Sequence, residues 1–195
     1  DIDPQYARAW YNLGNVLGDQ EKYAEAEEAL RRAIDIDPQY PRAWNLLGVI
    51  LKDQEKYPEA EEAYRRAIDI DPQYARAWTN LGNVLGDQDK YAEAEEAYRR
   101  AIDIDPQRVG AWGNLSYVLL YLDRYVDAEQ AARRVLRLRE GHHSNRRAWD
   151  IIASARGKQG KPPGQVLYAY RRMGRAIEGS RLDRTRWEDR LESFK

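Results

Sequence analysis

The sequence repeats itself with a period of 34 residues, and this period constrains the fold more than any other feature. The anchors in register are Trp10, Trp44, Trp78 and Trp112; Leu13, Leu47, Leu81 and Leu115; and Pro38, Pro72 and Pro106. A fixed period of this kind predicts a stack of identical supersecondary units, each too small to bury its own apolar face. The segments 7–40 and 75–108 differ at only four of 34 positions, which fits either recent duplication or a designed array.

Each unit is predicted to be a pair of helices. In the first unit, apolar residues spaced three and four apart predict a helix over Tyr6–Asp19, and a second over Tyr23–Ile34. Asp37-Pro38 ends the second helix, because proline lacks an N–H group and disfavours helical backbone in the residue before it. The break between the helices is short, so they are expected to be antiparallel neighbours.

The composition suits an elongated array with a large surface. Charged residues make up 33% of the 195 residues, and the mean hydropathy is −0.88. The absence of Cys excludes disulfides, thiolate nucleophiles and cysteine metal sites. No apolar run reaches the roughly 20 residues that span a bilayer and no signal-peptide pattern opens the chain, so we expect a cytoplasmic protein. Residues 1–5 (DIDPQ) match 35–39, so the chain is expected either to begin within a longer array or to have been trimmed.

Two further features recur with the period. Glycine stands in mid-helix at Gly14 and its equivalents, at a cost of about 1 kcal/mol relative to alanine, which predicts close approach of the partner helix near Ala26. Acid-to-arginine pairs four residues apart are interpreted as solvated charges on the outer helix: Glu27/Arg31, Glu28/Arg32, Glu61/Arg65, Glu62/Arg66, Glu95/Arg99 and Glu96/Arg100.

The pattern Trp-x2-Leu-Gly-x2-Leu, followed by Ala, Leu or Tyr, Ala and Pro, resembles the tetratricopeptide repeat (TPR). Units 7–40, 41–74 and 75–108 fit it fully, and 109–140 departs from it at Ser116 and Glu140. The resemblance implies an all-α, right-handed solenoid of antiparallel helix pairs. We expect four repeats within 1–140, and within 141–195 a degenerate pair, starting near Asn145, with a cap helix over about Asp183–Phe194.

The resemblance also implies a concave groove, lined by the first helices, that binds an extended peptide or a helix. The residues carried over by position are Arg8, Tyr11, Asn12, Asn15, Arg42, Asn45, Val49, Lys52, Arg76, Thr79, Asn80, Asn83, Asn114, Tyr117 and Tyr121. An Asn amide both donates to and accepts from a peptide unit, and Arg suits a carboxylate, so the expected partner is an acidic or carboxylate-bearing protein segment. The alternative is that these arginines bridge to neighbouring Asp and Glu within the chain.

Other functions remain as alternatives. An uncapped N-terminal face, with Tyr6, Trp10 and Leu17, predicts end-to-end self-association into a homo-oligomer. Residues 1–136 carry a charge of −9 and residues 137–195 carry +8, so nucleic acid is a distant third partner, met by Arg171, Arg172, Arg175, Arg181, Arg184, Arg186 and Arg190. We predict no enzyme, no cofactor and no metal site, because the only histidines, His142 and His143, lack ligand spacing.

Overall fold

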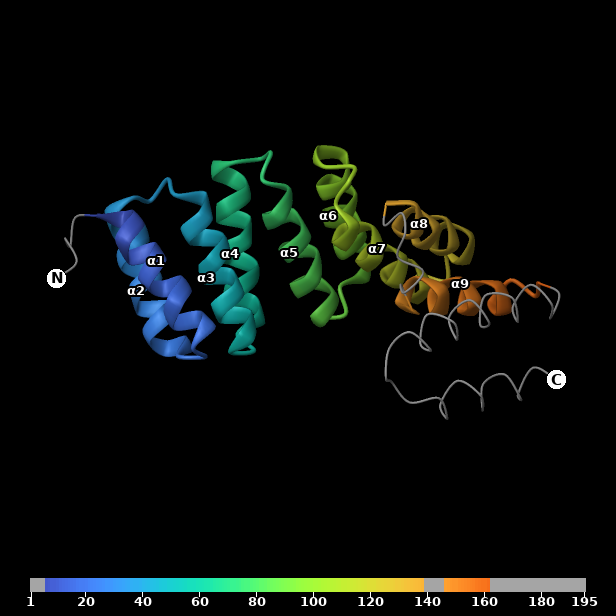
Figure 1. Ribbon diagram of the computed structural model, residues 1–195, viewed down its shortest axis with the longest axis horizontal. Helices are drawn as coiled ribbons and strands as arrows, with labels where there is room; N and C mark the ends of the chain where they lie inside the picture. The colour runs from blue at the N-terminus through green and yellow to red at the C-terminus, as the bar shows by residue number, and fades with distance from the viewer. Residues whose placement is uncertain (1–5, 139–145, 162–195) are drawn as a thin grey trace. The chain divides into compact units, whose positions relative to one another are not determined.

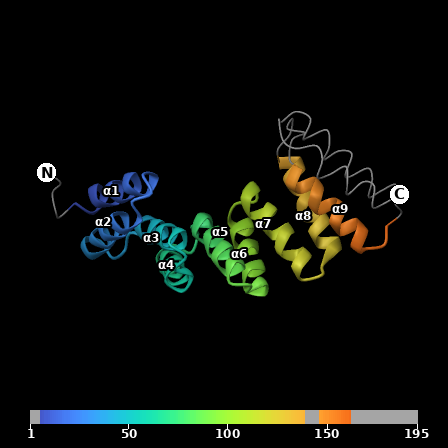
Figure 2. The ribbon, with the colours of Figure 1, turned by 90° about the horizontal axis from the view of Figure 1, so that it is seen from below.

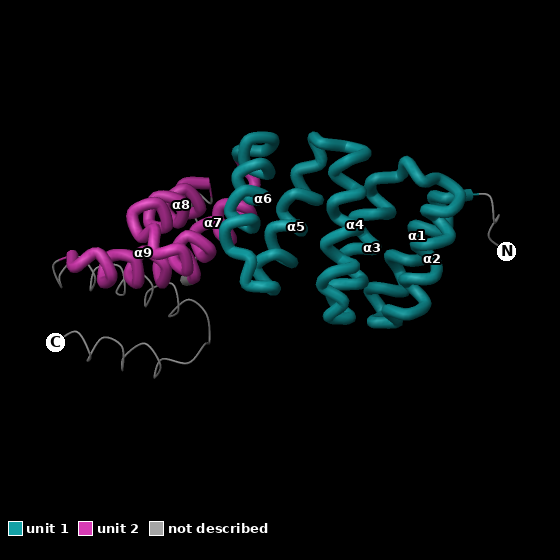
Figure 3. Tube along the Cα trace, turned by 180° about the vertical axis from the view of Figure 1, so that it is seen from behind, with its two compact units in different colours: residues 1–106 teal, residues 107–195 magenta. Residues whose placement is uncertain are grey.

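The computed structural model describes residues 6–138 and 146–161, and within them every regular element is an α-helix. The helices are α1 (Ala7–Asp19), α2 (Tyr23–Ile36), α3 (Pro41–Asp53), α4 (Tyr57–Ile70), α5 (Ala75–Asp87), α6 (Tyr91–Ile104), α7 (Val109–Tyr121), α8 (Tyr125–Leu138) and α9 (Arg146–Lys158). The chain divides into two compact units, residues 1–106 and residues 107–195 (Figure 3).

Unit 1 is a regular stack of three helix pairs. α1 packs on α2, α3 on α4 and α5 on α6, and the pairs are joined because α2 also contacts α3 and α4 contacts α5. The first helices α1, α3 and α5 are neighbours in turn (Figures 1 and 2). The predicted all-α solenoid of antiparallel helix pairs is therefore confirmed.

Unit 2 continues the same pattern of pairs. α7 packs on α8, and α9 contacts both of them. α9 supplies the first helix expected to begin near Asn145. The remainder of that degenerate pair and the cap helix over Asp183–Phe194 lie outside the described residues.

The helix boundaries follow from local backbone chemistry. The second helices run two residues beyond the predicted Ile34, because the proline restriction acts on Asp37 and leaves Ile36 helical. A left-handed residue lies two positions after each first helix, Glu21 in the first unit with φ 60°, and Lys22 N–H then donates to Leu17 O at 3.0 Å. This closing pattern satisfies carbonyl groups that the end of a helix leaves without partners. The equivalent left-handed residues are Glu55, Asp89 and Asp123.

The mid-helix glycines make room for a bulky side chain of the paired helix. A Cβ built on Gly48 would lie 2.6 Å from Tyr64 Cε1, and one on Gly82 would lie 2.5 Å from Tyr98 Cε1. At Gly14 the nearest atom is Leu30 Cγ, at 2.7 Å, and Ala26 O follows at 3.2 Å. The predicted close approach near Ala26 is present, but the nearest neighbour of each glycine is the side chain of Leu30 or of the equivalent tyrosine.

In the fourth unit the glycine position holds a larger residue and the partner position holds a smaller one. Ser116 replaces the glycine, and the position equivalent to Tyr98 holds Ala132, so the added atoms meet a small partner. Both residues are fully buried. The Ser116 hydroxyl donates to Gly113 O at 2.7 Å, within its own helix, which removes the cost of burying a hydroxyl without a partner.

Candidate functional site

The three predicted groove arginines of unit 1 are exposed, one on each first helix. Arg8 lies on α1, Arg42 on α3 and Arg76 on α5. Among the described residues none of the three forms an ion pair with a carboxylate. The alternative interpretation, in which these arginines bridge to Asp or Glu of the described chain, therefore finds no support.

An aromatic pair lies beside two of these arginines. The rings of Tyr11 and Tyr40 have centroids 5.3 Å apart and are tilted by 48°. Burial raises the pKa of Tyr40 and so does the neighbouring Tyr11, while Arg42 and Arg8 act in the opposite direction. The electrostatic influence of both guanidinium groups on one phenol shows that α1 and α3 bring two cationic groups into the same region.

The predicted asparagines fall into two groups. Asn12 and Asn15 on α1 are exposed. Asn80 Nδ2 of α5 donates to Asn45 Oδ1 of α3 at 3.0 Å, so these two amides connect neighbouring first helices, and Asn45 is buried. Asn83 Oδ1 accepts a hydrogen bond from the Tyr98 hydroxyl of α6 at 2.9 Å.

The remaining predicted residues of unit 1 have mixed surroundings. Lys52 is partly exposed and its ammonium lies 3.3 Å from the Asp53 carboxylate. Thr79 is buried and its hydroxyl donates to Ala75 O at 2.8 Å, one turn earlier in α5. A hydroxyl bonded to its own helix is a packing feature.

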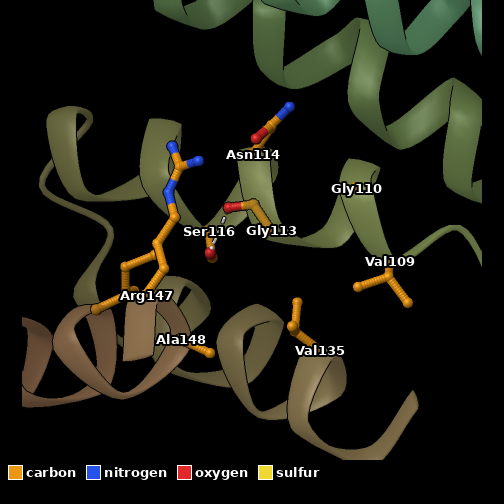
Figure 4. Close-up of a pocket in the computed structure, with 9 residues that line it drawn as sticks. Val109, Gly110, Gly113, Asn114, Ser116, Val135, Arg147 and Ala148 are labelled. Carbon is orange, nitrogen blue, oxygen red and sulfur yellow. Dashed lines mark hydrogen bonds between the residues drawn. The ribbon is translucent and has the colours of Figure 1, made fainter. Parts of the chain in front are cut away.

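In unit 2 the predicted residues gather on α7. Tyr117 and Tyr121 are exposed, their hydroxyl oxygens are 2.8 Å apart, and their rings meet edge to face at 5.0 Å. The guanidinium of Arg147, on α9, lies over the Tyr117 ring at 5.2 Å, a cation–π contact. Asn114, one turn before Tyr117, lines a pocket of about 250 Å³ beside Arg147 (Figure 4).

Neither Arg147 nor this pocket was predicted from the sequence. The available signal was a substitution within the repeat: Gly110 stands where the other units carry the groove arginine, and Gly113 stands where they carry Tyr, Asn or Thr. Two lost side chains on one face of a helix predict a hollow there. Arg147 itself stands two residues before Trp149, as Arg8 stands two before Trp10, so the degenerate fifth repeat carried a signal for this arginine.

The acid-to-arginine pairs are only partly the solvated charges that the sequence suggested. Glu27 accepts hydrogen bonds from Arg31 on its own helix at 2.9 Å, and from Gln54 and Lys56 of the next repeat at 3.0 and 2.9 Å. Burial, the largest single effect, acts to raise the pKa of Glu27, but the hydrogen bonds from Lys56, Gln54 and Arg31 outweigh it and lower the pKa to about 2.

The same contact recurs at the equivalent glutamates. Glu61 is buried and accepts from Gln88 and Lys90 of the following repeat, at 2.8 and 2.9 Å, which lowers its pKa against the effect of burial. Glu129 is also buried and accepts from Arg156 at 2.8 Å. For Glu27 and Glu61 the solvated interpretation is wrong, because each one bridges two successive helix pairs, and Glu129 forms the same kind of bridge.

Several other predictions concern absent chemistry or lie outside the described residues. Within residues 6–138 and 146–161 no cluster of three or more His, Asp or Glu side chains could hold a metal ion. The same part of the chain has no helix long and apolar enough to cross a membrane. His142, His143 and the seven arginines proposed for nucleic acid lie beyond the described part.

Family models described as tetratricopeptide repeat match residues 3–41, 11–75 and 75–108, more than half of the chain. The chain belongs to the tetratricopeptide repeat family. No curated protein matches the sequence.

Solved structures are similar in fold. MamA superposes with a TM-score of 0.79 at 19% identity, covering 88% of this chain and 92% of its own. YrrB, described as a TPR protein with an unusual peptide-binding site, has a TM-score of 0.77 at 16% identity and coverages of 97% and 93%. The first TPR of Spaghetti (RPAP3), bound to the HSP90 peptide SRMEEVD, has a TM-score of 0.60 at 24% identity and coverages of 63% and 97%.

Proposed function

We propose that this protein is a binding scaffold, and that the exposed face of α1, α3 and α5 holds an acidic, extended segment of another protein. The observation that carries the proposal is that Arg8, Arg42 and Arg76 are exposed and have no carboxylate partner among the described residues. A guanidinium presents a planar fork of donors that matches a carboxylate, and three in a row favour a segment with several acidic groups.

Two further observations support an extended peptide as the ligand. The exposed amides of Asn12 and Asn15 can each donate to and accept from a peptide backbone, which holds a strand without selecting its side chains. Structurally similar TPR proteins bind peptides, and the peptide on Spaghetti (RPAP3), SRMEEVD, is acidic.

Binding to an array of acidic and neutral peptides tests the proposal. Changing Arg8 and Arg42 together to Ala is expected to weaken the binding of acidic peptides about tenfold or more, since each exposed ion pair contributes up to about 1 kcal/mol. The matched control changes Arg32 and Arg100 to Ala, because these arginines are also exposed and lie on the second helices α2 and α6. Equal losses in both pairs, or no loss in either, would contradict the proposal.

A second candidate function is self-association through α1, and one comparison favours it. Val16 on α1 is 50% exposed, whereas the equivalent residues Ile50 on α3 and Val84 on α5 are 3% and 0% exposed. Among these three helices of unit 1, this position is therefore buried on α3 and α5 and half exposed on α1. Sedimentation velocity over a range of concentrations tests the idea: Val16→Lys should shift a concentration-dependent species to monomer, and a wild-type protein that is monomeric throughout would refute it.

A further inference from the structure

The pocket of unit 2 is lined by residues of three helices, α7, α8 and α9. It measures about 250 Å³, and its apolar wall includes Val135 from α8 and Ile151 from α9. An apolar cavity of about 150 Å³ is enough to hold a benzene molecule. The pocket on α7, α8 and α9 is therefore large enough for one leucine or phenylalanine side chain.

The pocket exists because α7 lacks two side chains that the other units carry. A Cβ added at Gly110 would meet no atom within 4 Å, and one added at Gly113 would meet only Val135 Cγ2, at 4.0 Å. Neither glycine is required by close helix packing, in contrast to Gly48. Each costs its helix about 1 kcal/mol relative to alanine, so the empty space is kept at the expense of helix stability.

One end of the pocket is polar. Figure 4 shows the Arg147 guanidinium and the Asn114 amide near one another on one side, with Val109, Val135 and Ala148 on the other. Arg147 is exposed, its guanidinium is held over the Tyr117 ring, and it forms no ion pair within the described chain. A hollow with an apolar wall and a positioned cation at one end is complementary to a ligand that has an apolar and an anionic group on one face.

We propose that this pocket binds an extended segment of a partner protein that inserts one large apolar side chain and places an acidic side chain on Arg147. The spacing follows from extended geometry: successive side chains point to opposite faces, so two on the same face belong to residues two apart, about 7 Å along the chain. The ligand is therefore an apolar residue separated by one residue from Asp or Glu. This inference rests on the proposed function in that the ligand is an extended peptide, and it assigns unit 2 its own side-chain preference.

The probes are capped peptides of alternating alanine and serine that carry leucine and glutamate at chosen positions. Fluorescence anisotropy with the full chain should show the strongest binding for leucine and glutamate two positions apart. Replacing the leucine by alanine should weaken binding about tenfold to a hundredfold, the effect of losing one buried apolar side chain. Peptides with glutamate adjacent to the leucine, or with a free C-terminal carboxylate in place of the glutamate, should bind much more weakly than the peptide with leucine and glutamate two positions apart.

Filling the pocket is the protein-side test. Gly110→Leu and Gly113→Leu place side chains in empty space and raise helix propensity, so both variants should fold and both should lose leucine-dependent binding. Gly157→Leu is the matched control, because Gly157 is an exposed glycine of α9 with nothing within 4 Å of an added Cβ, outside the pocket. If Gly110→Leu and Gly113→Leu fold like the control and bind the peptide as wild type does, the pocket assignment is overturned.

The acidic group is tested by a double-mutant cycle. Replacing the peptide's glutamate by glutamine should weaken binding to wild type and leave binding to Arg147→Gln unchanged. An equal glutamate effect in both proteins would remove Arg147 from the site and overturn the proposal, as would a wild-type protein that binds none of the probes. If acidic peptides bind more weakly to the Arg8 and Arg42 variants but bind the pocket variants as they bind wild type, this inference is refuted and the proposed function still stands.

Discussion

Two tyrosines at equivalent positions in successive repeats allow one substitution to be compared in two environments. The Tyr98 hydroxyl donates to Asn83 Oδ1 at 2.9 Å. The position equivalent to Asn83 in the preceding repeat is Val49, and the Tyr64 hydroxyl is buried with no hydrogen-bond partner among the described residues. Burial raises the pKa of Tyr64 well above its usual range, as expected for a phenol whose charged form would have nothing to stabilise it.

The same change, Tyr to Phe, should therefore have opposite effects on the free energy of unfolding. Tyr98→Phe loses a partly buried hydrogen bond and should destabilise the protein by about 1 kcal/mol. Tyr64→Phe removes a hydroxyl that was buried without compensation and should stabilise it by about 1 kcal/mol, within the range of about 1–3 kcal/mol for unsatisfied polar groups. The expected difference between the two variants is about 2 kcal/mol.

Urea denaturation measures both variants, and amide hydrogen exchange in α3 to α6 shows whether each change acts in its own repeat, since repeat arrays need not unfold in one step. A third variant, Val49→Asn, supplies the missing acceptor, and in that background Tyr64→Phe should become destabilising, as Tyr98→Phe is. If Tyr64→Phe destabilises the wild-type protein as much as Tyr98→Phe does, the Tyr64 hydroxyl has a partner and the reasoning is wrong.

Three other predictions concern a contact between repeats, a left-handed residue and the packing of a glycine. The pKa of Glu27 is about 2 in the folded chain and 4.5 in the unfolded chain, so ionised Glu27 contributes about 2 kcal/mol to the free energy of unfolding after screening of its half-exposed partners. This contribution is complete above about pH 4.5 and is lost as the pH falls towards 2. In an acid titration, the free energy of unfolding of Glu27→Gln should therefore depend less on pH than that of the wild type. Glu55→Gly should stabilise the chain by up to about 1 kcal/mol in urea denaturation, because Glu55 has a φ of 61°, and a loss would show that its side chain is needed. Gly48→Ala should lower the melting temperature by forcing the Tyr64 ring aside, whereas Gly86→Ala, with open space around it, should raise it; similar shifts would refute the packing argument.

The sequence determined the helix pairs because the signals for them are local and repeated. The Trp, Leu and Gly positions mark the packed side of each first helix, and Asp37-Pro38 marks the end of the second. Even the glycine's partner was implied, since Leu30 is replaced by tyrosine in the next two units and by Ala132 where Ser116 takes the glycine's place. The joint change to Ser116 and Ala132 in the fourth unit indicates contact between these two positions.

The contacts between repeats were harder to predict. Glu27 and Glu28 look alike in sequence, and both have an arginine four residues later, yet only Glu27 turns toward the next repeat and meets Gln54 and Lys56. Which of two adjacent carboxylates is buried depends on the rotation of one helix pair against the next, which a short-range pattern does not fix. The pocket beside Arg147 depends in the same way on a helix from a neighbouring pair.

The residues that join successive repeats and the residues exposed on the first helices vary independently. Folding and recognition therefore depend on different positions of the repeat. A glutamate that bonds to the following helix pair occurs in unit 1 at Glu61 and in unit 2 at Glu129, even though its partner changes from Gln88 to Arg156. The exposed arginine of the first helix, by contrast, becomes Gly110 in unit 2, with no packing reason for the loss. Because the stack needs the joining contact but not the arginine, first-helix positions can differ between units without disturbing the fold, and differences there are where binding preferences should be sought.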